Sequence, residues 1–227
     1  MFVWLGSGRA RKRHVGDKGR FLDEAARAGL PVPAGAILLD EFYRFCLDND
    51  LAQYVGRRPV IPDIELWHNT LFHSVRLPPF DRMVAVRPVG FCPDNSAGSA
   101  PAARLWVDIS DPGAAAEAVS AVWATAHCPQ PVRADVLIME MVAAGHAGQV
   151  RLGEREEDEV TVTSPSAATF PLLQLPPRRA PDESLPPFTR RLQMLLRGCR
   201  RTFGAVVREI EWIDDGAICY LIGATAG

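Results

Sequence analysis

Apolar residues recur along the chain at two different spacings, and these spacings predict a mixture of helices and strands. Between Asp17 and Ala28 the apolar positions form a helical stripe, and Gly29 follows where a helix commonly ends. Residues 34–39 instead form a short continuous apolar run, which is typical of a buried strand. The mixed order of the two element types predicts an α/β or α+β fold. Further helices are predicted over residues 40–47, 63–76, 111–126 and 188–203, and further strands over residues 81–87, 105–109, 136–142 and 160–163.

The last third of the chain contains a predicted hairpin and a proline-rich stretch. Residues 206–213 and 217–222 are apolar-rich runs joined by Asp214-Asp215-Gly216, and Asp-Gly is a strong signal for a hairpin turn. Residues 164–187 contain seven prolines, so this stretch is predicted to be a loop or surface excursion. It is not long enough to serve as a linker between two separate domains.

Composition and charge place the chain among ordinary soluble globular proteins. Its 227 residues suffice for one large domain or two small lobes, with 48% hydrophobic and 23% charged residues. The net charge of -2 gives no general attraction to nucleic acid or to an anionic membrane. The five cysteines form no Cys-x-x-Cys pair and are odd in number, which favours reduced thiols in a cytoplasmic setting over disulfides or a zinc site.

The first fourteen residues are apolar first and basic second, the reverse of a signal peptide, and the sequence has no apolar run long enough to span a membrane. The cluster from Arg9 to Arg13 predicts a solvated basic arm over residues 1–14. The alternative interpretation is contact with an acidic partner or RNA.

Four sequence blocks, taken in order, resemble one family. Val15-Gly16-Asp17-Lys18-Gly19, a helix and then Gly29-Leu30-Pro31-Val32-Pro33-Ala34-Gly35 resemble the start of the nucleotide-binding domain of phosphoenolpyruvate synthase, pyruvate phosphate dikinase and rifampicin phosphotransferase. The resemblance implies an α+β fold of the ATP-grasp-like, two-lobed nucleotide-binding type over residues 15–227, with a lobe boundary near residue 104. The three further blocks are Val84–Arg87, Val136–Val142, and Glu209–Trp212 with Tyr220–Ile222.

The same resemblance implies which residues bind the nucleotide. A lysine at a helix start adds charge to the positive end of the helix dipole, and an arginine at a strand end can grip two phosphate oxygens. The alternatives to phosphate binding are a solvent-exposed Lys18 and an Arg87 that pairs with an acid such as Glu211. No catalytic residue is implied. The residues implied to bind ATP are Lys18, Arg87, Gly98, Glu140 and Met141, and the residue implied to bind Mg²⁺ is Glu211.

Departures from the family pattern weaken the expectation of catalysis. Pro88-Val89 replaces two serines, Gly223 replaces a glutamine beside the metal, and Thr225 replaces an arginine. Phosphoryl transfer depends on positioning and on charges that neutralise the transferring group. None of the five histidines lies in the context of a phosphohistidine domain. Whether the chain is an enzyme is left open.

Three functions follow from these observations. The leading hypothesis is a stand-alone, eroded dikinase-type ATP-binding domain that acts as a nucleotide-binding or regulatory subunit, without complete phosphotransfer chemistry. The second is the ATP-binding half of a split phosphotransferase, with a separate phosphohistidine-domain chain as its partner. The third is a structural subunit with a vestigial nucleotide cleft. Neither membrane nor nucleic acid is expected as a partner.

Overall fold

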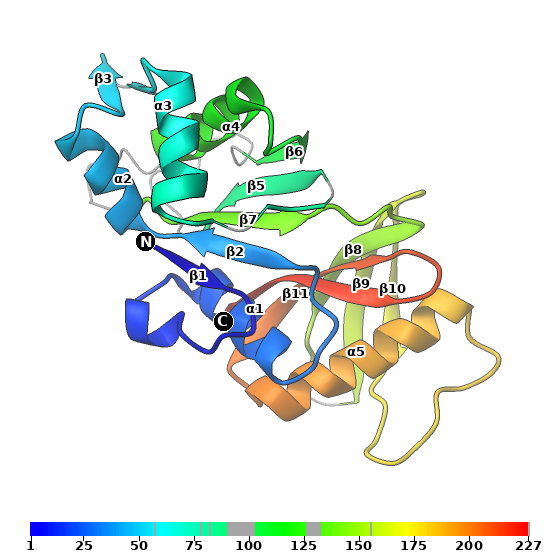
Figure 1. Ribbon diagram of the computed structural model, residues 1–227. Helices are drawn as coiled ribbons and strands as arrows, with labels where there is room; N and C mark the ends of the chain where they lie inside the picture. The colour runs from blue at the N-terminus through cyan, green and yellow to red at the C-terminus, as the bar shows by residue number, and fades with distance from the viewer. Residues whose placement is uncertain are drawn as a thin grey trace. The chain divides into compact units, whose positions relative to one another are not determined.

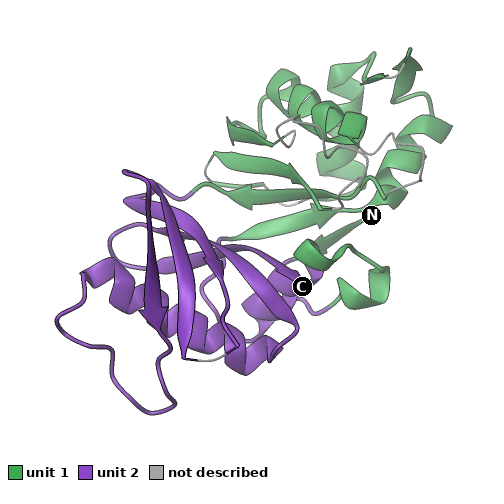
Figure 2. Ribbon diagram, turned by 180° about the vertical axis from the view of Figure 1, so that it is seen from behind, with its two compact units in different colours: residues 1–4, 9–19, 34–141 green, residues 5–8, 20–33, 142–227 purple. Residues whose placement is uncertain are grey.

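The computed structural model of the protein describes residues 1–56, 58–77, 79–81, 83–89, 103–125, 133–154 and 156–226. The chain divides into two compact units, shown in different colours in Figure 2. Each unit contains one five-stranded sheet, and all the described strand pairs are antiparallel. Helices combine with these sheets, so the α+β class predicted from the sequence is confirmed. Unit 1 comprises residues 1–4, 9–19 and 34–141, and unit 2 comprises residues 5–8, 20–33 and 142–227.

Unit 1 is a sheet with helices α2, α3 and α4 over one of its faces (Figure 1). Alternate residues of the strands, such as Leu38, Val84 and Ile138, pack in one core with Phe42, Trp67 and Trp123 from the helices. The sheet order is β1 (Phe2–Trp4), β2 (Gly35–Leu38), β7 (Val136–Glu140), β5 (Val84–Pro88) and β6 (Arg104–Val107). The other elements are α2 (Asp40–Asp48), α3 (Ile64–Asn69) with a π-helical turn (Thr70–Ser74), α4 (Pro112–Thr125) and a hairpin of β3 (Gln53–Val55) and β4 (Arg58–Val60).

The main boundary between the units lies between Met141 and Val142, whereas the sequence suggested a position near residue 104. The reason is the sheet order: β7 is hydrogen-bonded between β2 and β5, so a strand far along the chain completes the first sheet. Sequence order alone does not reveal such a pairing.

Unit 2 is a second antiparallel sheet on which helix α5 (Pro187–Phe203) packs through β11 and β12. The predicted hairpin is confirmed, with Gly216 in its turn at a φ of +96°. The predicted proline-rich loop is wrong in part, because it contains the strand β10. The sheet order is β10 (Ala168–Leu173), β9 (Glu157–Ser164), β8 (His146–Arg151), β11 (Val207–Asp214) and β12 (Cys219–Ala226).

Helix α1 (Asp17–Arg27) ends as the sequence predicts. Gly29 has a φ of +79°, a left-handed conformation that glycine adopts without strain. Its N–H donates to the carbonyl of Ala26 (3.1 Å), and the N–H of Leu30 donates to the carbonyl of Ala25 (3.0 Å). These two bonds form a Schellman motif, which satisfies the last carbonyls of the helix.

Residues 1–14 are part of the fold and not a detached arm. Strand β1 pairs with β2, and Ala10 is fully buried. The basic side chains of the short 3₁₀-helix Arg11–Arg13 are nevertheless exposed, as the sequence suggested. The apolar start, which looked like the beginning of an arm, is an edge strand because Val3 buries against the sheet.

Unit 2 contains a buried ion pair between α5 and the end of β11. Asp214 is completely buried, and its two oxygens accept hydrogen bonds of 2.7 Å each from Nε and Nη2 of Arg191. The N–H of Gly216 also donates to Asp214 (3.0 Å). The hydrogen bonds that Arg191 donates to Asp214 raise the pKa of the Arg191 guanidinium. The pair therefore fixes the helix to the hairpin turn.

The buried thiols lead to a prediction about pH. Burial raises the pKa of Cys46 and of Cys199 to about 12, from an ordinary value of 9.0. Only the thiolate is nucleophilic, so neither thiol should react with iodoacetamide at about pH 8 in the folded protein. Because the unfolded chain releases these protons first, the free energy of unfolding should fall as the pH rises from about 9 to about 12.

The measurement uses a Cys92→Ser/Cys128→Ser variant, which leaves the three buried cysteines. Mass spectrometry counts the alkylated cysteines with and without guanidinium, and denaturant curves at several pH values give the stability. Rapid alkylation of the folded variant, or an unfolding free energy that does not change across this pH range, would contradict the prediction.

Candidate functional site

The turn that carries Lys18 packs closely against the sheet of unit 1. A Cβ atom at Gly19 would lie 2.7 Å from Val15 Cγ1, 2.8 Å from Ile37 Cδ1 and 2.9 Å from Val89 Cγ1. No side chain fits there unless these groups move, so glycine is what allows the start of α1 to approach β2 and the residue after β5. The glycine next to the lysine therefore has a packing role.

The segment that follows Arg87 is fixed against the same turn. A Cβ atom at Gly16 would lie 3.3 Å from the backbone oxygen of Val89, and the N–H of Val89 donates to the carbonyl of Asp135 (3.2 Å). The Lys18 turn and the end of β5 are thus neighbours within unit 1. The sequence predicted that both would contact phosphate.

Arg87 shares a sheet face with the residue that supports this turn. Arg87 lies directly opposite Leu137 on β7, and Leu137 lies directly opposite Ile37 on β2. Directly opposed residues of antiparallel strands project from the same face. Ile37 is one of the residues that Gly19 approaches, so Arg87 and the start of α1 belong to one side of the sheet. The positive end of a helix dipole favours an anion at the start of a helix.

Glu140 and Met141 lie at the other end of β7. Arg87 pairs with Leu137 and Val84 pairs with Glu140, a separation of three residues or about 10 Å along the strand. Glu140 shares the face of Val84, which packs toward the helices, and not the face of Arg87. The N–H of Glu140 donates to Ala34 and that of Met141 to Met83, both at 2.8 Å. Because both N–H groups already donate to backbone carbonyls, a nucleotide base at this end of β7 would not be bound through them.

Glu211 lies in unit 2, in a polar row across the sheet. Its neighbours directly across the strands are Gln149 on β8 and Gly223 on β12, and Gln149 lies opposite Thr161 on β9. Ile210 and Trp212, on either side of Glu211 in the sequence, are fully buried, so Glu211 projects from the opposite face.

The row beside Glu211 is charged and paired. Arg151 lies 3.8 Å from Glu159 and 3.9 Å from Glu209. All three side chains are more than half exposed, so these are surface ion pairs. This face of the sheet is polar, in contrast to the face beneath α5.

The described residues include no group of three or more His, Cys, Asp or Glu side chains that could hold a metal ion. Mg²⁺ is commonly held by one or two carboxylates together with phosphate oxygens and water. Glu211 is a single carboxylate of this kind on the sheet of unit 2, and its role as a Mg²⁺ ligand stays a prediction. Gly98, predicted to approach the phosphates, lies outside the described residues. No helix within the described ranges is long and apolar enough to cross a membrane.

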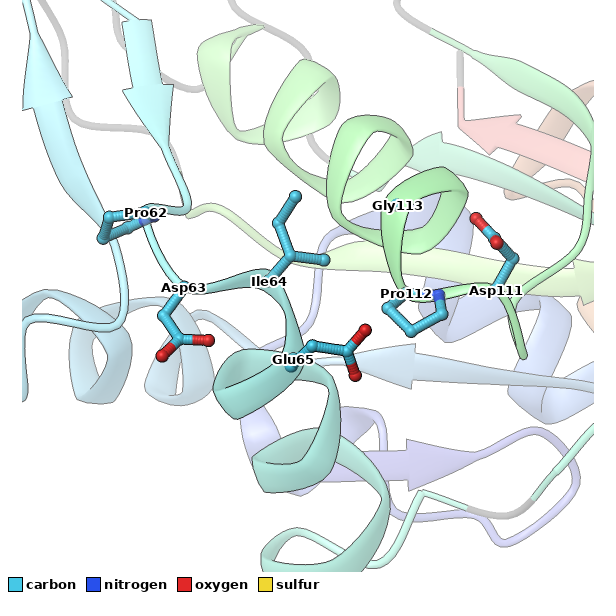
Figure 3. A pocket seen from close by; sticks show the side chains of 7 residues that line it. All are labelled: Pro62, Asp63, Ile64, Glu65, Asp111, Pro112 and Gly113. Carbon is cyan, nitrogen blue, oxygen red and sulfur yellow. The ribbon is translucent and has the colours of Figure 1, made fainter.

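A pocket of about 540 Å³ opens between the starts of α3 and α4 in unit 1 (Figure 3). Two of its three lining carboxylates have structural roles: Asp63 accepts the N–H of Leu66 (2.9 Å), and Asp111 accepts the N–H of Ala114 (2.6 Å). Both are helix caps. None of the predicted site residues that the structure describes lines this pocket, which the sequence did not indicate.

No protein-family model and no curated protein matches the sequence. Among solved structures, D-alanine-D-alanine ligase from Helicobacter pylori matches 89% of this chain and 48% of its own, with 12% identity and a TM-score of 0.44. ATP citrate lyase from Methanothrix soehngenii, in complex with citrate and coenzyme A, matches 99% of this chain and 50% of its own, with 11% identity and a TM-score of 0.43.

The chain thus spans about half the length of each of these structural neighbours. With both TM-scores below about 0.5, the likeness carries no argument about family, substrate or reaction.

Proposed function

We propose that this chain is an ATP-binding domain that acts as a nucleotide-binding or regulatory subunit without complete phosphotransfer chemistry. The observation that supports it best is the close packing of the Lys18 turn on the end of β5, which carries Arg87. The two cationic residues come from different elements of unit 1, and both belong to segments fixed by close contacts.

The chemistry of such an arrangement suits a polyphosphate. A lysine in the first turn of a helix adds its charge to the positive end of the helix dipole, and an arginine can bind two phosphate oxygens at once. Hydrogen bonds to charged groups contribute roughly 1.5–3 kcal/mol each. Two such donors support weak to moderate affinity, with a dissociation constant of about 10 µM to 1 mM.

The surroundings of Glu211 support a role in binding more than in catalysis. Gly223, directly opposite on β12, contributes no side chain, and the other neighbour is the uncharged Gln149. Transfer of a phosphoryl group needs several charges that neutralise the transition state. We also propose a protein partner for this subunit. The sequence resemblance makes a subunit with a phosphohistidine domain the candidate, and this is the partner that the split-phosphotransferase alternative requires.

The test is calorimetry with Mg-ATP. The wild-type protein should bind, and Lys18→Ala and Arg87→Ala should each weaken the affinity by about tenfold or more, because each removes one charge-assisted contact. The matched controls are Lys12→Ala, in the exposed 3₁₀-helix, and Arg190→Ala, on the partly exposed side of α5, and both should bind as the wild type does.

Other outcomes would select other functions. No heat and no thermal shift with millimolar Mg-ATP would overturn the proposal and favour a structural subunit with a vestigial cleft. Lys18-dependent formation of AMP from ATP, on addition of a phosphohistidine-domain protein, would favour the split phosphotransferase.

A further inference from the structure

Trp106 has an unusual backbone conformation and an exposed side chain. Its φ is +58°, in the left-handed region that bulky residues rarely adopt, and 59% of its surface is exposed. Among the other tryptophans, Trp4 is 37% exposed, and Trp67, Trp123 and Trp212 are buried. The backbone of Trp106 is therefore strained and its indole ring is exposed to solvent. Both features raise the free energy of the folded state relative to a buried, unstrained tryptophan.

The strain has a local cause in strand pairing. Val84 pairs with Val107 and Val86 pairs with Arg104, so one residue on β5 faces two residues, Leu105 and Trp106, on β6. This is a β-bulge, and a left-handed bulge position usually carries glycine. Bulges redirect a side chain, and backbone strain is often retained at binding sites. A tryptophan in the place of a glycine thus points to a role for its ring.

The bulge lies toward the end of the sheet that carries Glu140 and Met141, two residues that the sequence resemblance implies to bind ATP. Val107 pairs with Val84, and Val84 pairs with Glu140, so two strand spacings, or about 10 Å, separate β6 from Glu140. Met83, which is 45% exposed, accepts the N–H of Met141. Met83, just before β5, the strand that pairs with β6, thus places one exposed apolar side chain beside the end of β7.

We propose that Trp106 is a stacking platform for the base of a bound nucleotide, and that it gives the site its preference for a purine nucleotide over a polyphosphate without a base. This inference rests on the proposed nucleotide-binding function. Stacking on an exposed indole uses the flat apolar face of a base and needs no further hydrogen bond. An added β-strand is a poorer occupant of this edge, because the bulge interrupts the ladder of N–H and C=O groups such a strand would pair with.

The test compares Trp106→Gly with Trp106→Phe. Glycine removes the strain at φ +58°, so Trp106→Gly should melt at a higher temperature than the wild type. It should nevertheless bind ATP about tenfold more weakly, while its affinity for tripolyphosphate stays unchanged. Trp106→Phe should retain most of the ATP affinity, and Trp4→Ala, which removes the other partly exposed tryptophan, should retain all of it.

The possible results separate the stacking inference from the nucleotide-binding function on which it rests. If the wild type binds ATP and Trp106→Gly binds it equally well, the stacking inference is overturned and the nucleotide-binding function stands. If the wild type binds neither ATP nor tripolyphosphate, both proposals fail. If light scattering shows a wild-type dimer that Trp106→Gly dissociates, with no change in ATP affinity, the ring serves a second copy of the chain instead.

Discussion

Replacing Arg191 with methionine is expected to lower the free energy of unfolding by about 3–5 kcal/mol. In the wild type, the completely buried carboxylate of Asp214 accepts two hydrogen bonds of 2.7 Å from Arg191. The substitution leaves this carboxylate without its cation and without these bonds. A buried charge without its partner costs several kcal/mol, far more than a lost surface contact. Urea unfolding followed by circular dichroism measures the effect.

A second substitution identifies the cause. Asp214→Asn in the Arg191→Met background removes the buried, unpaired charge and keeps an acceptor for the N–H of Gly216. It should therefore recover much of the lost stability. Arg151→Met is the surface control. Its pairs with Glu159 and Glu209 are long and exposed, so it should cost about 0.5 kcal/mol or less. Equal losses for Arg191→Met and Arg151→Met would refute this account.

Replacing Gly148 with alanine is expected to disrupt the sheet of unit 2, at a cost of about 3 kcal/mol or more. A Cβ atom there would lie 2.0 Å from the carbonyl oxygen of Thr161 and 3.0 Å from its carbonyl carbon. These are backbone atoms, so no change of rotamer can relieve the overlap. Strands β8 and β9 would have to separate at the irregularity between Ala147 and Gly148.

Gly113→Ala is the matched control for this prediction. Gly113 lies in the first turn of α4, and a Cβ atom there meets only Asp111 Oδ1, at 3.4 Å. Alanine should be neutral or slightly stabilising at this position, because it reduces the freedom of the unfolded chain. Thermal denaturation of the three proteins provides the comparison, and a Gly148→Ala variant as stable as the wild type would show that the strands can shift without cost.

The sequence predicted those elements whose signals are local. The stripe containing Phe21 and Leu22, together with Gly29, fixes α1 and its end. Asp215-Gly216 fixes the hairpin turn between β11 and β12. These patterns operate within a few residues, so periodicity and turn chemistry are enough to find them.

Strand β10 could not be predicted in this way, because Pro171 interrupts it. Proline lacks the N–H that a central strand needs, but it is tolerated on an edge, and β10 is the edge strand of its sheet. Strand β8 was missed for a related reason: Gly148 breaks its alternation of apolar residues. Both depend on which strand lies beside them, which the sequence does not state.

The candidate site also combines residues that have local sequence signals with one residue whose conformation depends on strand pairing. Lys18 and Arg87 are predicted from short recognisable blocks, and the structure brings their segments together in unit 1. Trp106 was read as part of a regular strand over residues 105–109. Its strain depends on how β6 pairs with β5, where two residues face one. No pattern within the strand itself reports that mismatch.

The order in which the chain alternates between its two units limits how the gene can recombine. Six segments alternate between the units, so the backbone passes from one to the other five times. A recombination event between codons 141 and 142 would separate Phe203 in α5 from Phe21, whose rings pack at 5.4 Å within unit 2, and Gly198 from Leu30. Neither unit is encoded by a single continuous gene segment, so neither can be exchanged alone by one recombination event. We therefore expect the two units to be gained or lost together in evolution.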